Sequence, residues 1–309
     1  MKMQSSKFFL ILASFTVIIS FLEGCDKKPS SESKTTTPPT AVVVRTNAKD
    51  GAEMVLVPAG EFIVGSTDDQ IEAAYQAAMK VVNVPHSDYT DEGPQHKVYL
   101  DEYCIYRTPV TVAQYKKFCA ATGHAMPQRP QWGWKEDHPI VNVSWDDAQA
   151  YCKWAGVHLP TEAQWEKAAR GTDARLYPWG NKWDNTRLQC SKNAPSDAGS
   201  TVPVGNFPTG ASPYGCLDMA GNVWQWCADW FDVDYYKTSP KRNPTGPDHG
   251  DFRVMRGGSW RYGGPIIFMF RASDRNRQAP DGGTSIRDPV SGGLWKAHDE
   301  IGFRCVSDP

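Results

Sequence analysis

Three short helices are marked by their capping residues, and all three lie between residues 111 and 171. Each begins with a hydroxyl side chain at the N-cap and an acceptor three residues later, in the pairs Thr111 with Gln114, Ser144 with Asp147, and Thr161 with Gln164. A glycine stands where each helix should end, at Gly123, Gly156 and Gly171. No helical pattern of useful length follows from residue 172 to residue 309. The second half of the chain must therefore consist of short strands, turns and loops.

Short strands are expected before these helices. Residues 54–65 are β-rich and interrupted by a Pro-Ala-Gly turn, residues 68–80 favour a short helix, and residues 97–106 favour another strand. The 12 Trp, 26 Gly and 23 Pro residues indicate a loop-rich fold in which large rings pack many short elements. An array of carbohydrate-stacking tryptophans is the alternative interpretation. No repeat or boundary divides residues 50–309, so we expect one domain.

The N-terminus is typical of a bacterial export signal. A basic start precedes an apolar run that is too short to span a membrane, and the run ends at Leu22-Glu23-Gly24-Cys25. This ending resembles the lipoprotein box, in which the cysteine receives lipid; ordinary signal-peptide cleavage nearby is the alternative. We expect residues 1–24 to be a lipoprotein signal peptide, residues 25–50 a lipid-anchored cysteine and disordered linker, and residues 51–309 the folded domain. The protein would then be an exported bacterial lipoprotein, held at the membrane through Cys25 and facing the periplasm or the cell surface.

Export would place the cysteines in an oxidising compartment, where disulfides form. Seven cysteines follow Cys25, so at least one remains a free thiol. Their spacing shows no zinc-type cluster. The sequence leaves five of them without assigned partners, namely Cys104, Cys119, Cys190, Cys216 and Cys227.

Ten short segments occur in an order that characterises one enzyme family. They include Leu159-Pro-Thr-Glu162, Asp218-Met-Ala-Gly-Asn-Val-Trp-Gln-Trp226, Arg256-Gly-Gly-Ser-Trp260 and Gly302-Phe-Arg-Cys305. The full set covers residues 57–65, 91–96, 108–115, 139–145, 150–155, 159–170, 177–181, 218–226, 256–260 and 301–305. In this order they resemble the formylglycine-generating enzyme family, also called the sulfatase-modifying-factor family. The resemblance implies a single α+β domain of the C-type-lectin-like kind, with much irregular structure.

The resemblance also implies one disulfide. Cys152 and Cys305 match a family pair, and closing a loop of that length would stabilise the domain by roughly 4–5 kcal/mol on the chain-entropy model. A second family disulfide falls on Ala169 and Ala272. Because both partners are alanine, that bond is absent as a unit, which supports the register of the comparison.

A calcium site is implied in the same way. Its side-chain, carbonyl, carbonyl and side-chain ligands fall on Asp218, Gly221, Val223 and Gln225. Oxygen ligands of this mixture suit calcium. Gln225 replaces the usual glutamate and removes a charge, so a weak site and an empty site are both open.

The family's reactive group is missing. Formylglycine formation uses a copper ion between two thiolates, a soft metal on soft ligands. The resemblance places those cysteines at Tyr262 and Ile267, and neither side chain replaces a thiolate. Glu300 stands where the family has asparagine, the histidines are scattered, and Ser259 has no evident base partner. We therefore expect no copper and no formylglycine formation by the thiolate route.

Several functions remain open. The first is a binding or assembly module for a protein, peptide or glycan, with residues 282–293 as a wall of the cleft. Its cleft residues would be Trp224, Ser259, Trp260, Arg261, Tyr262 and Glu300. The second is a divergent periplasmic oxidase, like the family branch that matures a peptide siderophore. The third is formylglycine generation through another nucleophile, and the fourth is a hypervariable receptor. The net charge of −2 predicts no nucleic-acid partner.

Overall fold

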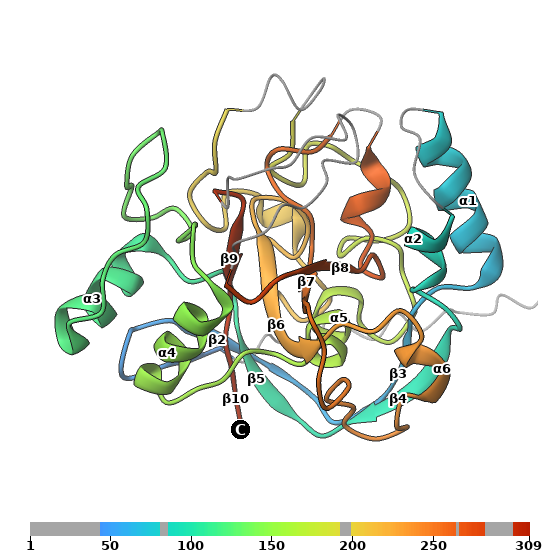
Figure 1. Ribbon diagram of the computed structural model, residues 1–309, viewed down its shortest axis with the longest axis horizontal. Coiled ribbons are helices and arrows are strands. Elements are labelled where there is room, and N and C mark those ends of the chain that lie inside the picture. Colours follow the sequence, from blue (N-terminus) through green and yellow to red (C-terminus); the bar gives the residue numbers. More distant parts are fainter. Residues whose placement is uncertain (1–43, 81–85, 192–198, 264–265, 282–298) are drawn as a thin grey trace, which may run out of the picture. The chain divides into compact units, whose positions relative to one another are not determined.

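Helices lie at both ends of the folded unit, and short strands lie between them (Figure 1). The computed structural model describes residues 44–80, 86–191, 199–263, 266–281 and 299–309. The helices are α1 (Asp68–Met79), α2 (Ser87–Thr90), α3 (Val112–Thr122), α4 (Trp145–Ala155), α5 (Glu162–Arg170) and α6 (Tyr235–Thr238), with the 3-10 turns η2 (Pro208–Gly210) and η3 (Ile267–Phe270). The strands are β1 (Val44–Thr46), β2 (Glu53–Val57), β3 (Gly60–Val64), β4 (His96–Leu100), β5 (Tyr103–Tyr106), β6 (Trp224–Trp230), β7 (Arg253–Arg256), β8 (Asn276–Gln278), β9 (Ile301–Phe303) and β10 (Val306–Ser307).

The three capped helices form as predicted. At α3, α4 and α5 the N-cap hydroxyl accepts from the backbone three residues later, and the side chain there accepts from the N-cap backbone. Asp147 completes this box at α4 with a 3.0 Å bond from the backbone nitrogen of Ser144 to Oδ2. The helices end at Gly123, Gly156 and Gly171, all with positive φ, as glycine allows at low cost. Bonds within four residues therefore fix where each helix starts and stops.

Three small sheets carry the rest of the fold. One has the order β1-β2-β5-β10, the second pairs β3 with β4, and the third has the order β8-β7-β6-β9. Among the strands that the structure describes, the pairings are antiparallel except that of β6 with β9. The expected interruption of residues 54–65 is confirmed, because β2 and β3 are separate strands.

The strand expected at residues 97–106 is also divided, into β4 and β5. Asp101 lies at the break, where its carboxylate pairs with Arg242 and accepts a 2.6 Å bond from the side chain of Asn243. The side-chain oxygen of Asn243 in turn accepts from the backbone nitrogen of Asp101, at 2.9 Å. Contacts with residues more than 140 positions further along the chain thus stabilise a bend that the local sequence pattern did not reveal.

Folded structure begins before residue 51, where the linker was predicted to end. β1 is hydrogen-bonded to β2. Asp50 is buried, and its carboxylate accepts from the hydroxyls of Tyr106 and Tyr151 at 2.6 and 2.5 Å. The predicted linker, residues 25–50, therefore extends too far toward the C-terminus. The predicted signal peptide and Cys25 lie outside the described residues.

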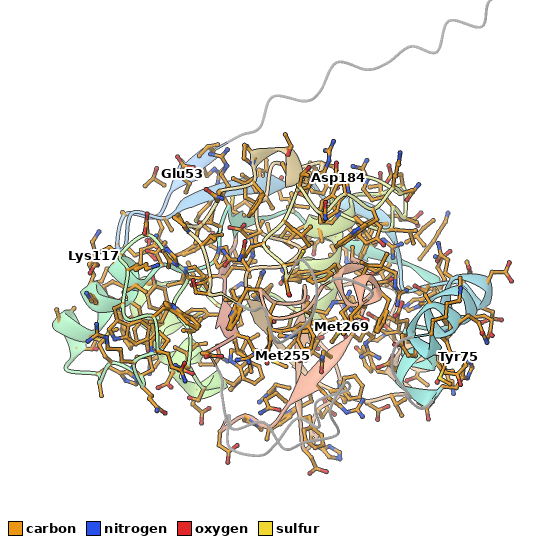
Figure 2. The ribbon with its side chains drawn as sticks, turned by 90° about the horizontal axis from the view of Figure 1, so that it is seen from above. Glu53, Tyr75, Lys117, Asp184, Met255 and Met269 are labelled. Atoms are coloured by element: carbon orange, nitrogen blue, oxygen red, sulfur yellow. The ribbon has the colours of Figure 1, made fainter. Side chains whose placement is uncertain are left out.

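α5 occupies the middle of the domain and contacts β3, β4, β6 and β7. Trp165 on α5 and Met255 on β7 are completely buried. Figure 2 shows Met255 in the interior, with Tyr75 of α1 and Lys117 of α3 toward opposite ends. Within the described part of the chain, no helix has both the length and the apolar character needed to cross a bilayer.

Candidate functional site

The Arg256–Trp260 motif leaves β7 in a tight turn made by two glycines. Gly257 and Gly258 have φ values of 101° and 74°, which disfavour other residues. A Cβ atom on Gly258 would lie 2.6 Å from the ring of Phe270, so the backbone approaches too closely for a side chain there. The motif therefore needs both glycines, and they place Ser259 in the interior.

Ser259 meets Glu300 beneath this turn. The Ser259 hydroxyl donates to Glu300 Oε2 at 2.6 Å, and both residues are buried. The backbone nitrogen of Trp224 donates to the carbonyl of Glu300 at 2.8 Å, next to the parallel pairing of β6 and β9. Sequence reasoning found no base for Ser259, and the tertiary fold supplies a carboxylate from 41 residues away. The pair does not form a Ser-His-acid arrangement, because the partner is a carboxylate and not an imidazole.

Arg261 and Trp260 lie beside this pair. Arg261 Nη2 is 2.7 Å from Asp299 Oδ1, and its guanidinium lies 4.7 Å from the centre of the Trp260 ring. Trp260 also donates from its indole nitrogen to the carbonyl of Asp299 and packs edge-to-face against Trp132. Asp299 and Trp132 were missed from the sequence. Asp299 could have been found as the neighbour of Glu300, whereas Trp132 gave no local signal.

Of the two positions that the resemblance assigns to copper thiolates, Tyr262 is used for packing, and Ile267 is partly buried. Tyr262 is buried, and its ring lies edge-to-face with Trp224 at 6.4 Å between centroids. Its carbonyl accepts from the backbone nitrogen of Ser191 at 2.8 Å. Ile267 begins η3. The structure thus brings the six predicted cleft residues together mainly as buried groups, and residues 282–293, the predicted wall, lie outside the described residues.

No cluster of three or more His, Cys, Asp or Glu residues with the geometry of a metal site occurs among the described residues. The predicted calcium ligands are occupied by protein hydrogen bonds. The amide nitrogen of Gln225 donates to the carbonyls of Asp218 and Val223 at 2.7 and 3.5 Å. Its oxygen accepts from Trp165 at 2.9 Å and from Arg304 at 2.6 Å. Two donors face one end of the amide and two acceptors the other, which fixes its orientation.

A calcium ion among these carbonyls would have to replace the Gln225 amide and lie close to a guanidinium. The carboxylate of Asp218 is turned to another donor, because its Oδ2 accepts from the backbone nitrogen of Gly205 at 2.7 Å. Burial raises the pKa of Asp218. As arranged, these residues do not fit a calcium ion, and calcium remains a prediction of the resemblance alone.

Cys152 of α4 and Cys305, after β9, lie side by side as the resemblance implied. Their sulfur atoms are 3.3 Å apart, and both are free thiols in this structure. A disulfide bond would require about 2.05 Å. The pairing therefore remains a proposal, with the two partners already in reach. Cys104, Cys119, Cys216 and Cys227 are likewise free thiols in this structure.

Buried ion pairs fix the floor of the motif to α5. Arg256 Nη2 lies 2.5 Å from Glu166 and Nη1 lies 3.3 Å from Glu162. Glu166 also binds Arg170 at 2.8 Å, and Glu162 binds Arg275 at 2.8 Å. Burial by itself would raise the pKa of Glu162, but Arg275 and Arg256 outweigh it and lower that pKa. Glu162 and Glu166 thus form part of a buried ion-pair network that connects α5 to the motif.

Asp91 is a buried carboxyl group that, among the described residues, lacks hydrogen bonds like those of Glu162 and Glu166. It is buried, and neither carboxylate oxygen accepts a hydrogen bond from the described residues. Burial raises its pKa to about 7; Arg275 and Arg277 oppose the shift, while Glu92 and Glu162 add to it. The folded protein therefore holds a proton that the unfolded chain, with an Asp pKa of about 4, releases. Stability must fall as pH rises from about 4 to about 7.

The variant Asp91→Asn should be more stable than the wild type at pH 8, by about 2 kcal/mol. A shift of about 3 units corresponds to about 4 kcal/mol, and relaxation of the site reduces it. At pH 4 the two proteins should differ little, because the carboxyl is then mostly neutral when folded. Urea unfolding at both pH values measures the difference. A variant less stable than the wild type at pH 8 would mean that the charge of Asp91 is stabilised by Arg275.

The fold and the motif have counterparts in known proteins. The profile of the family described as "Sulfatase-modifying factor enzyme 1-like domain" matches residues 40–309. The formylglycine-generating enzyme of Streptomyces coelicolor is 34% identical, over 82% of this chain and 88% of that protein. The chain therefore belongs to the formylglycine-generating enzyme (sulfatase-modifying factor) family, and the resemblance seen in the sequence is confirmed.

Other relatives span different members of the family. Hercynine oxygenase of Mycolicibacterium smegmatis is 31% identical, over 79% of this chain and 61% of that protein. The structure of PvdO from Pseudomonas aeruginosa superimposes with a TM-score of 0.65 at 26% identity, covering 86% of this chain and 98% of that one. The α+β, C-type-lectin-like fold is thereby shown. Ala169 and Ala272, where the resemblance places a second family disulfide, are both buried in one hydrophobic core cluster.

Proposed function

We propose that this protein uses the family scaffold to bind a ligand and does not oxidise cysteine by the copper–thiolate route. One feature of the sequence supports the proposal: Tyr262 and Ile267 stand where the resemblance to the family places the two thiolates. A phenol and an alkyl group offer no soft ligand to copper(I). The phenol is moreover packed against Trp224, where it stabilises the domain.

Next to the motif, the guanidinium of Arg261 lies against an aromatic ring and could form part of a recognition surface. Arg261 has 18% of its side chain exposed, is oriented by Asp299 and rests on Trp260. A fixed guanidinium stacked on an indole is a common element of binding sites, because it loses little entropy when it meets a polar group. Beside it, the buried Ser259–Glu300 pair gives the site a polar floor. This combination supports a protein, peptide or glycan ligand.

The proposal includes export and anchoring. Its support is the sequence pattern around Cys25, with an apolar run before it and a Ser/Thr/Pro-rich stretch after it. Lipid chains on Cys25 would hold the protein at the membrane, facing the periplasm or the cell surface. The domain would then meet its ligand within the reach of the linker.

A divergent periplasmic oxidase is the second candidate. The similarity to hercynine oxygenase supports it, because that relative carries oxygen chemistry on a related chain. This candidate requires a metal or cofactor site other than the two family cysteine positions. Metal analysis of the purified full chain separates the two: stoichiometric copper or iron would favour the oxidase and contradict the binding module.

Incubation of the full chain with copper, oxygen and a cysteine peptide of the sulfatase motif should yield no aldehyde. The thiolates that hold copper are absent, so the cysteine of the peptide should keep its mass. Mass spectrometry of the peptide measures this, with the Streptomyces coelicolor enzyme as positive control. The double variant Tyr262→Cys/Ile267→Cys is the matched comparison for regained copper binding. Aldehyde formation by the wild type above the peptide-only background would refute the proposal.

A further inference from the structure

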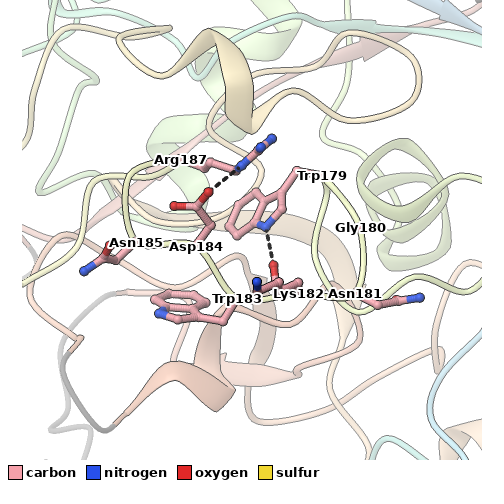
Figure 3. A pocket seen from close by; sticks show the side chains of 8 residues that line it. All are labelled: Trp179, Gly180, Asn181, Lys182, Trp183, Asp184, Asn185 and Arg187. Atoms are coloured by element: carbon pink, nitrogen blue, oxygen red, sulfur yellow. Dashed lines mark hydrogen bonds and ion pairs between the residues drawn. The ribbon is translucent and has the colours of Figure 1, made fainter.

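A pocket apart from the motif is built by the loop that follows Tyr177. Its volume is about 640 Å³, and two tryptophans and five polar side chains of residues 179–187 line it (Figure 3). This volume lies within the range of about 300–1,000 Å³ that small-molecule sites occupy. The sequence marked Tyr177-Pro-Trp-Gly-Asn181 only as a family motif of the fold. Aromatic rings beside polar and charged side chains, as in this lining, are suited to binding a ligand.

The two indoles form a fixed, angled platform. Trp179 and Trp183 are half-buried, with ring centroids 6.2 Å apart and planes inclined by 53°. Each is supported from behind: Tyr177 stacks on Trp179 at 5.4 Å, and Phe270 stacks on Trp183 at 5.5 Å. The Trp179 indole nitrogen donates to the carbonyl of Lys182 at 2.9 Å. Rings held in this way lose little freedom when a ligand stacks on them.

Beside the rings lies an oriented, charged pair. Asp184 Oδ2 accepts from Arg187 Nε at 2.9 Å, while Oδ1 accepts from the hydroxyl and backbone nitrogen of Thr186 at 2.6 and 3.0 Å. These bonds, from Thr186 first and Arg187 second, lower the pKa of Asp184 to about 2, so the carboxylate is ionised at neutral pH. Arg187 Nη1 donates to the carbonyl of Thr209 at 2.7 Å and is thereby fixed. Figure 3 shows this pair and both indoles around the same pocket.

We propose that this pocket binds a pyranose oligosaccharide. The C–H face of a sugar ring is apolar and stacks on an indole, while its hydroxyls both donate and accept hydrogen bonds. The lining matches both needs, because carboxylate, amide and guanidinium groups stand next to the two rings. The exposed amide of Asn185 adds both a donor and an acceptor.

Other flat ligands suit the pocket less well. A nucleic acid would bring phosphates close to the ionised Asp184, and the chain has no net positive charge to attract them. A purely apolar ligand would strip water from five polar side chains without replacing their hydrogen bonds. In the lining, Arg187 balances Asp184 and leaves one excess positive charge on Lys182. Neutral and singly acidic sugars are therefore both compatible with it.

The test uses titration calorimetry of the full chain with N-acetylchitotetraose, cellotetraose and mannotetraose, each to millimolar concentration. We expect saturable binding of at least one, weakened about tenfold or more in Trp183→Ala and a few-fold in the milder Asn185→Ala. Trp154→Ala is the matched control, since Trp154 is half-buried on α4, outside this pocket, and binding should persist in it.

Three results would overturn the proposal. The first is no saturable binding of any of the three sugars. The second is binding that survives Trp183→Ala and Asn185→Ala but is lost in Trp260→Ala, which would move the ligand to the motif and favour the function proposed above instead. The third is binding that disappears in EDTA and returns with calcium, because ring stacking needs no metal. The aldehyde test is independent of all three, so either proposal can fail alone.

Discussion

Replacing Glu166 by glutamine should lower the free energy of unfolding by about 3–5 kcal/mol. The Glu166 carboxylate is completely buried and accepts from Arg170 at 2.8 Å, from Arg256 at 2.5 Å and from the backbone of Gly65 at 2.8 Å. Glutamine has nearly the same shape but no charge, and its amide nitrogen must face an arginine. Arg170 would then lose its carboxylate partner, and Arg256 would keep only Glu162, which it already shares with Arg275. An uncompensated buried charge costs several kcal/mol.

Urea unfolding of Glu166→Gln measures this loss as a lower midpoint with an unchanged slope. The matched control is Glu61→Gln, which breaks an exposed pair with Lys97 at 3.6 Å. Exposed pairs of this kind contribute at most about 1 kcal/mol, so the control should scarcely move. If Glu166→Gln were as mild as the control, water would have to reach the network, and the buried arginines could not anchor the motif to α5.

Oxidation should join Cys152 to Cys305 and raise the free energy of unfolding by about 4–5 kcal/mol. The two sulfur atoms are 3.3 Å apart and completely enclosed, so only a small movement is needed to bond them. The bond would close a loop of about 150 residues and restrict the unfolded chain accordingly. It would tie α4 to the segment between β9 and β10.

Peptide mass spectrometry without reducing agent detects the bond as a cross-link between the two cysteine peptides. The Cys152→Ser variant should lose both the cross-link and the gain in stability under oxidising conditions. Cys119→Ser, which removes a half-buried free thiol on α3, should keep both. Equal alkylation of the Cys152 and Cys305 thiols after oxidation and unfolding would contradict the pairing.

The candidate site divides into parts that the sequence could and could not predict. The motif shows in the sequence that Gly257 and Gly258 are adjacent glycines, and in the structure both have positive φ values. The absence of both copper thiolates is a prediction of the sequence, in which the resemblance places them at Tyr262 and Ile267. The Ser259–Glu300 bond and the support of Arg261 were not visible in the sequence. Their partners, Glu300 and Asp299, come from the segment just before β9, 41 and 38 residues further along the chain.

The aromatic pocket shows the same division. The sequence marked Trp179 only as part of a family segment, and Trp183 only as a member of a Trp-rich composition. Their support by Tyr177 is local, but Phe270 reaches Trp183 from 87 residues further along the chain. Whether a tryptophan fills a core or lines a pocket depends on what covers its second face, and spacing along one chain does not contain that information.

The sequence by itself determined the three capped helices with their caps, and it predicted the absence of the copper ligands. Each of these depends on residues within four positions of one another or on the identity of a single side chain, as in Thr161 with Gln164. Only the tertiary structure decided which arginines neutralise Glu162 and Glu166, that the Gln225 amide occupies the predicted calcium ligands, and where folded structure begins. Several of the contacts that decide these outcomes join segments 60 or more residues apart, such as those of Gln225 with Trp165 and of Arg275 with Glu162. Burial then makes such pairings obligatory, since a charge or amide removed from water must find its partner within the protein.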